Sequence, residues 1–249
     1  MSVRPHMSMS LTVLGCQTPY PKPDQPCSGY LLRMGPSIVW VDAGPGTFAE
    51  LQRHVGLADI DAIWISHLHP DHCADLLSAW NAFVNTPSLS RPVVFGPPGW
   101  VERVDAMLGQ DGAVGSVFIT QEVCDGDALR IGSVDVSAWQ VEHSVPAFGL
   151  RAQYRDRVFA YSADSGPCPQ LADLARSAHV LVIEAGADTP QPHHCTPEEA
   201  GDVATASQVS RVILTHVSPG VAPEHALWRL QTRFAGSADL GRSGLTVPV

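Results

Sequence analysis

The chain alternates short apolar runs with segments whose apolar residues recur every three or four positions. In its first third, apolar runs at 11–15, 30–34, 38–42 and 60–66 have the length and composition of buried strands. A helix fits 48–55, after a turn that glycine and proline impose in Asp42-Ala43-Gly44-Pro45-Gly46. This part of the chain is therefore expected to form a sheet with a helix against it.

The same alternation continues to the C-terminus. Leu76, Leu77, Trp80 and Phe83 lie at helical spacing, and further helices fit 170–176, 197–206 and 224–234. Strands are expected at 93–95, 117–119, 128–131, 134–141, 148–154, 158–162, 180–184 and 212–215. Alternation of this kind predicts an α/β sandwich with sheets inside and helices outside, in a single domain over residues 1–249.

The net charge of the chain limits the classes of ligand that it is expected to bind. The formal net charge is −10 at pH 7, which argues against binding of a long nucleic acid, because such binding depends on lysine and arginine at many phosphates. A small anionic substrate suits this charge better, since bound divalent ions would create a local positive site.

Cysteine usage and hydropathy indicate the compartment. The six cysteines form no CxxC pair, and the longest apolar runs are far below the roughly 20 residues of a membrane span. The first ten residues contain no apolar stretch of the kind found in a secretory signal. We therefore expect a cytoplasmic protein with reduced thiols and no membrane association.

The strongest chemical signal is His67-Leu68-His69-Pro70-Asp71-His72, at the end of a predicted strand. Residues two apart on an extended stretch point the same way, so His67 and His69 can bind one ion together. The turn at Pro70 directs Asp71 and His72 towards a second ion. Imidazole and carboxylate ligands suit Zn²⁺, with Mn²⁺ or Fe as alternatives. A solvated histidine-rich loop would require the same clustering by chance.

This HxHxDH motif resembles that of the metallo-β-lactamase superfamily, and the family's other landmarks recur in order along almost the whole chain. They are Asp42 in Val-Asp-Ala-Gly, His143 after a strand, Asp164 in Tyr-Ser-Ala-Asp-Ser-Gly and His216 in Ile-Leu-Thr-His. The resemblance implies an αββα sandwich with two mixed sheets between helices. It also implies two divalent metal ions, one bound by His67, His69 and His143, the other by Asp71, His72 and His216, with Asp164 bridging.

The resemblance assigns Asp42 a supporting role. In the family this aspartate orients the metal-bearing loop and does not bind metal itself. The alternative is an aspartate that only forms the turn before glycine.

A narrower resemblance concerns His194-Cys195-Thr196, followed by Glu199-Ala200-Gly201. This stretch is similar to the His-Ser/Thr loop of the superfamily's phosphodiesterase branch, which includes RNase Z and cyclic phosphodiesterases. The resemblance implies that His194 reaches the scissile phosphate as a general acid, while Asp71 positions the nucleophile or accepts its proton. Cys195 departs from the usual Ser/Thr, and an ordinary histidine near a helix cap is the alternative for His194. His193 is expected to face solvent.

RNase Z enzymes commonly insert a long arm that grips transfer RNA between the third and fourth ligand motifs. Here only 20 residues separate His143 from Asp164, and two predicted strands occupy them, so transfer-RNA processing is the less favoured role. Relatives in this branch often form homodimers, which makes a homodimer an expectation from resemblance alone.

The resemblance predicts a two-metal phosphodiesterase for a small phosphodiester, such as a cyclic nucleotide or a related compound. Fold and metals leave the substrate open, so an acyl hydrolase (a thioesterase or lactonase) and a non-catalytic, metal-binding pathway accessory protein are the alternatives. The loop Pro19-Tyr20-Pro21-Lys22-Pro23 is expected to be a stiff connector or a substrate-contacting segment, because family members often place this first hairpin near the metals.

Overall fold

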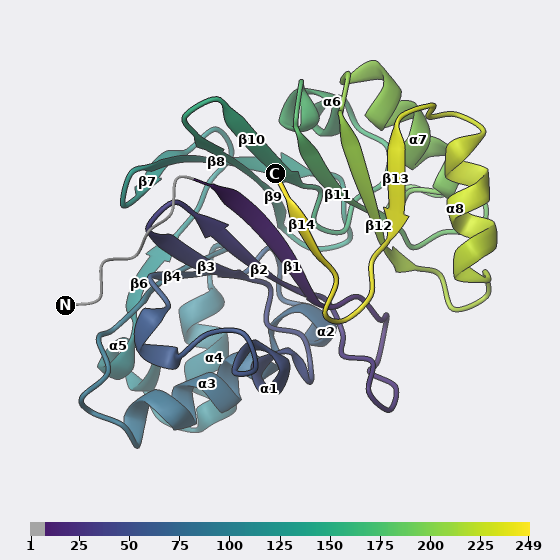
Figure 1. Ribbon diagram of the computed structural model, residues 1–249. Coiled ribbons are helices and arrows are strands. Elements are labelled where there is room, and N and C mark those ends of the chain that lie inside the picture. The colour runs from purple at the N-terminus through teal and green to yellow at the C-terminus, as the bar shows by residue number, and fades with distance from the viewer. Residues whose placement is uncertain (1–7) are drawn as a thin grey trace.

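The computed structural model describes residues 8–249 and contains two seven-stranded sheets packed face to face (Figure 1). The first sheet has the order β14-β1-β2-β3-β4-β5-β6. Its strands are β1 (Met9–Gly15), β2 (Gly29–Met34), β3 (Ser37–Val41), β4 (Ala62–Trp64), β5 (Val93–Gly96), β6 (Ile119–Glu122) and β14 (Thr246–Pro248). Strands β1 to β3 pair antiparallel, whereas β3 to β6 run parallel, so the sheet is mixed.

The second sheet has the order β13-β12-β11-β10-β9-β8-β7 and is also mixed. Its strands are β7 (Ala128–Ile131), β8 (Val134–Val141), β9 (Ala147–Tyr154), β10 (Arg157–Tyr161), β11 (Val180–Ala185), β12 (Arg211–Val217) and β13 (Ser237–Leu240). Because β9 is antiparallel to both β8 and β10, and β10 to β13 are parallel, strands β8, β10 and β12 point the same way. Their carboxyl ends therefore meet at one edge.

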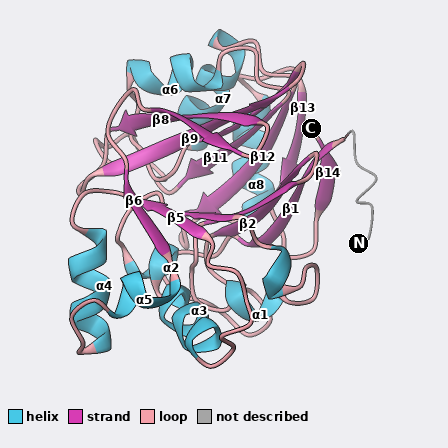
Figure 2. Cartoon of the chain, turned by 90° about the vertical axis from the view of Figure 1, so that its left-hand side faces the viewer, coloured by secondary structure: helices cyan, strands magenta, loops and turns pink. Residues whose placement is uncertain are grey.

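Helices cover the outer face of each sheet (Figure 2), which confirms the predicted αββα sandwich. On the first sheet lie α1 (Thr47–Leu51), α2 (Pro70–Cys73), α3 (Asp75–Val84), α4 (Trp100–Leu108) and α5 (Ala113–Val117). On the second lie α6 (Pro169–Ala175), α7 (Pro197–Ala206) and α8 (Pro223–Gln231). None of the helices within residues 8–249 is long and apolar enough to cross a membrane.

Strand β3 shows why the inner strands are apolar on both faces. All five of its residues are buried. Val39 and Val41 pack into the core between the two sheets, whereas Ile38 and Trp40 pack against the helices on the outer face. A strand covered on both sides carries a continuous apolar run instead of an alternating one, and this is the pattern that the sequence shows.

Three expected elements differ from the structure. The predicted strand at 117–119 is wrong at its start, because Val117 ends α5 and packs with Phe118 in the helix-side core, so that β6 begins at Ile119. The predicted helix at 48–55 ends as a helix at Leu51. The strand expected at 60–66 pairs only over Ala62–Trp64, because the chain beyond it turns away from the sheet towards His67.

Candidate active site

The candidate metal ligands follow the carboxyl ends of four strands. The segment from His67 to His72 comes after β4, His143 after β8 and Asp164 after β10, while His216 lies near the end of β12. The structure brings these side chains into groups whose ligand atoms lie within 4.8 Å of one another. The groups are His67, His69, His143 and Asp164; Asp71, His72 and His216; and Asp164, His194 and His216.

The carboxylate of Asp164 lies between the first two groups. Its Oδ2 is 3.1 Å from Nε2 of His216 and 3.8 Å from Nε2 of His67, and its Oδ1 is 3.3 Å from Nε2 of His72. One carboxylate thus faces histidines of both groups.

The outer ligands of each group are equally close. Nδ1 of His69 lies 3.1 Å from Nε2 of His143, so the two rings present different nitrogens to one point. Oδ2 of Asp71 lies 3.4 Å from Nε2 of His216 and 3.8 Å from Nε2 of His72. Each group therefore offers nitrogen and carboxylate oxygen ligands together.

The hydrogen-bonding state of these atoms fits metal binding. Within residues 8–249, Nε2 of His67, His72 and His216 and Oδ1 of Asp164 are buried and form no well-aligned hydrogen bond, although Nε2 of His72 lies 3.3 Å from Oδ1 of Asp164. Buried polar atoms are almost always hydrogen-bonded, and four ligand atoms that converge on one place without aligned hydrogen bonds fit a site with cations between them. The chain thus holds clusters that fit the divalent metal binding of this fold.

Burial also controls the charge of the imidazoles. It lowers the pKa of His67 well below its ordinary value and that of His143 to about 4, so both rings are neutral at neutral pH and have a lone pair for a metal. Burial opposes charging of His216 as well, but the Asp164 carboxylate raises the pKa of His216 to about 10. The carboxylates therefore require positive charge at this point, which a divalent cation supplies.

Asp42 anchors the histidine loop from behind. This fully buried carboxylate accepts hydrogen bonds from the Ser66 N–H at 2.7 Å, the Ser66 hydroxyl at 2.8 Å, Nδ1 of His72 at 2.7 Å and the Tyr161 hydroxyl at 2.7 Å. The bond to His72 fixes the ring so that Nε2 faces the cluster. Asp42 therefore orients a candidate ligand without joining the cluster itself.

Three residues around the cluster have left-handed backbone that non-glycine residues rarely adopt. These are Asp42 (φ 54°), Ala163 (φ 56°) and His216 (φ 48°). Ala163 directly precedes Asp164, so two candidate ligands and their support depend on strained conformations. Such strain persists where the surrounding structure imposes it.

His194 lies beside the cluster and is held by a residue that the sequence did not reveal. Nδ1 of His194 is 2.8 Å from Oε1 of Glu184, and the His194 ring stacks on that of His216 with centroids 5.5 Å apart. Burial disfavours the imidazolium, but the hydrogen bond and charge of Glu184 raise the pKa of His194 above its ordinary value. Glu184 ends the apolar run 180–183, and an acid in that position was the available signal.

Glu184 is itself fixed in place. Its side chain is buried, and Oε1 also accepts a hydrogen bond from the Ser165 N–H at 2.8 Å, while Oε2 accepts one from the Gly186 N–H. The carboxylate therefore holds the His194 ring with Nε2 left free.

His193 does not simply face solvent as expected. The residue is partly buried, and its carbonyl accepts a hydrogen bond from Nδ1 of His143 at 2.9 Å. The same loop thus orients a candidate ligand through His193 and brings His194 to the cluster.

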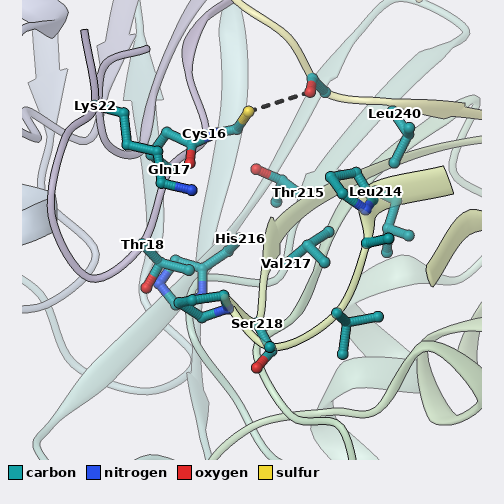
Figure 3. Close-up of a pocket in the computed structure, with 16 residues that line it drawn as sticks. Cys16, Gln17, Thr18, Lys22, Leu214, Thr215, His216, Val217, Ser218 and Leu240 are labelled. Carbon is teal, nitrogen blue, oxygen red and sulfur yellow. Dashed lines mark hydrogen bonds between the residues drawn. The ribbon is translucent and has the colours of Figure 1, made fainter. Parts of the chain in front are cut away.

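A pocket of about 260 Å³ adjoins the cluster at His216 (Figure 3). Its walls are the loop that follows β1 and the segment from Leu214 to Pro223, at the end of β12 and the start of α8. The Thr18 hydroxyl of the loop donates a hydrogen bond to Oδ2 of Asp71 at 3.3 Å. The residue directly before the proline-rich loop therefore contacts a candidate metal ligand.

Comparison with known proteins agrees with this site. Residues 38–217 match the Beta-lactamase superfamily domain. Uncharacterized protein ML1173 of Mycobacterium leprae is 31% identical, with 98% of this chain and 89% of that protein covered. Ribonuclease Z of Mycobacterium marinum is 30% identical, with 94% and 96% covered. The metallo-beta-lactamase fold protein YhfI of Bacillus subtilis is 23% identical, with 96% and 99% covered and a TM-score of 0.87.

The family match spans most of the chain and all the candidate ligands from His67 to His216. The M. leprae relative extends the likeness over nearly the full length. This chain belongs to the beta-lactamase superfamily and has the metallo-beta-lactamase fold.

Proposed function

We propose that the protein is a phosphodiesterase that hydrolyses a small phosphodiester with two divalent cations, preferably Zn²⁺. The observation that carries this proposal is the pair of His194 and Glu184 beside Asp164 and His216. The histidine and carboxylate cluster alone would serve many hydrolases of this fold. A histidine held at its edge by a buried carboxylate adds a proton donor for an alkoxide leaving group, which phosphodiester hydrolysis needs.

The ligands His67, His69, His143, Asp71, His72 and His216, with Asp164 between them, would hold the cations. Bound cations supply Lewis acidity, which lowers the pKa of water and neutralises charge on a phosphate. Asp71 would orient the attacking water or accept its proton. His194, with Nδ1 bonded to Glu184, presents Nε2 and gives its proton to the leaving oxygen.

Size and charge favour a small substrate. The pocket beside His216 has a volume of about 260 Å³, and the net charge of −10 offers no broad footprint for a polynucleotide. Only strands β9 and β10 with their turns lie between His143 and Asp164, which leaves no room for an RNA-gripping arm at that point. All six cysteines are free thiols, which supports a cytoplasmic location.

A substrate panel on protein of measured metal content tests the proposal. Bis-p-nitrophenyl phosphate and cyclic nucleotides should be hydrolysed in preference to thioesters and lactones. His194→Ala should lower kcat on phosphodiesters by about a hundredfold or more, the usual contribution of a general acid, and leave metal content unchanged. His225→Ala, at an exposed histidine of α8, is the matched control. Turnover of thioesters or lactones without phosphodiesterase activity would contradict the proposal.

A further inference from the structure

The pocket beside His216 has a chemical character that the metal cluster does not explain. Gln17, Thr18 and Lys22 line one side, and residues 214–218 approach from the other (Figure 3). Leu214, Val217 and Leu240 add apolar wall. The pocket thus combines an apolar surface with hydroxyl, amide and ammonium groups, next to one of the candidate metal ligands.

Lys22 is the only lysine in the sequence of 249 residues. Within residues 8–249 it has no ion-pair partner, although the protein contains 25 acidic residues. The pocket lining contains no aspartate or glutamate. A single exposed lysine without an ion-pair partner, at the edge of a pocket lined by no carboxylate, favours an anionic ligand.

The adjoining groove has the opposite character. It shares Cys16, Gln17 and Leu240 with the pocket, but it is also lined by Asp24, Glu224 and Asp239, the last paired with Arg211, and by the one cation of Arg242. An anionic group would be repelled there and attracted to the Lys22 side. The charges therefore select which of the two hollows receives the negative part of a ligand.

The backbone around Lys22 is anchored at several points. Its N–H donates to the Gln25 carbonyl at 3.0 Å, and its carbonyl accepts from the Gln25 N–H at 2.9 Å. At the base of the loop, the Cys16 thiol donates to the Gly241 carbonyl at 3.1 Å. Prolines at 19, 21 and 23 restrict the chain further. The ammonium is thus carried on a backbone whose ordering costs little on binding.

We propose that Lys22 binds an anionic oxygen group of the substrate, a phosphate or a carboxylate, in the pocket beside His216. Lys22 is then a residue that determines specificity, and it disfavours ligands with a cationic group at this point. This inference rests on the proposed function in taking the pocket as the substrate pocket. The oxygen group has two sources, the scissile phosphate itself or a second acidic group on the same substrate.

Because Lys22 is the only lysine, it can be observed alone. Reductive methylation of the metal-loaded protein with ¹³C-formaldehyde labels its ε-amine and the chain's α-amine, which resonate separately. Addition of inorganic phosphate or phosphoglycolate should shift the lysine methyl signal and leave the α-amine signal in place. Absence of any shift with both ligands at saturation, shown by calorimetry on the same sample, would overturn the proposal.

Variants provide the quantitative test. Lys22→Met should weaken binding by about tenfold, the value of one charge-assisted hydrogen bond, while Lys22→Arg stays within about threefold of the original protein. Arg242→Met, in the carboxylate-lined groove, is the control. Equal losses for phosphate and phosphoglycolate identify the scissile phosphate as the bound group, and a loss confined to phosphoglycolate identifies a second acidic group. Unchanged affinity of Lys22→Met for both ligands contradicts the proposal.

These binding experiments involve no turnover, so their result is independent of whether the protein hydrolyses a phosphodiester. If the protein binds phosphate through Lys22 but hydrolyses no phosphodiester, the proposal for Lys22 stands and the proposed reaction is wrong. If the protein hydrolyses phosphodiesters but Lys22→Met binds both ligands as tightly as the original protein, the proposed reaction stands and the proposal for Lys22 is wrong.

Discussion

The two halves of the candidate metal centre are built in different ways. The first half comes from one loop, which supplies His67, His69, Asp71 and His72 within six residues. The second half comes from single residues, His143, Asp164 and His216, which separate strands of the other sheet bring to its edge. Local sequence places the first half, whereas the second exists only when the strands of the second sheet are assembled.

The supports differ in the same way. Asp42 holds the loop through three hydrogen bonds, two to Ser66, which directly precedes His67, and one to His72, and it is itself held by the Tyr161 hydroxyl. In the other half, Glu184 holds His194, which does not belong to the predicted ligand set. Under the proposed function, the first support would act on metal binding and the second on chemistry, a distinction that variants can test.

The largest effect is expected at Asp164, which lies between the two groups of candidate ligands. Asp164→Asn removes the charge of the carboxylate that faces His67, His72 and His216, so both groups should lose affinity for metal. We expect metal content to fall and activity to drop by more than about a hundredfold, beyond the range of supporting residues. Elemental analysis measures the metal content, and steady-state kinetics measure the activity. Full metal content in the variant would show that the two ligand groups bind metal without the charge of Asp164.

A smaller loss is expected from the support of the loop. Asp42→Asn should reduce metal affinity about 10- to 100-fold, because His72 loses the charged partner that orients its ring. Competition with a metal chelator measures the affinity, and Asp173→Asn on the exposed surface is the control. If Asp42→Asn lowers kcat and leaves metal affinity intact, the division of labour between the two supports is wrong.

The smallest effect is expected from the support of His194. Glu184→Gln keeps a hydrogen-bond acceptor for Nδ1 but removes the charge, so kcat should fall about tenfold, less than the hundredfold or more expected for loss of the general acid itself, with metal content unchanged. Combined with His194→Ala, it should cause little further loss, because it acts through that ring. Additive losses would show that Glu184 contributes independently of His194.

Sequence reasoning succeeded where the information is local. Strand β8 and helix α7 have the predicted bounds, because an alternating run specifies the one and a capping box of Thr196 and Glu199 starts the other. Helices α4 and α5 and strands β13 and β14 were missed. Strand β14 has three residues and pairs with β1, more than 230 positions away, so its conformation depends on a distant partner.

The site shows the same division. The motif of residues 67–72 predicts metal binding from its composition and spacing alone. The pairing of Glu184 with His194 and the position of Lys22 beside His216 depend on the packing of strands and loops that are far apart in sequence. Contacts of this kind have no local pattern that could reveal them before the chain is folded.

The left-handed backbone at Asp42, Ala163 and His216 has a consequence for how the protein can change. Glycine at position 163 would relax its own conformation, since glycine adopts positive φ without a steric penalty, yet it would loosen the segment that aims Asp164. Selection for heat resistance should therefore favour glycine at position 163, whereas selection for turnover should favour alanine. At these three positions beside the cluster, a substitution that raises stability is expected to lower activity.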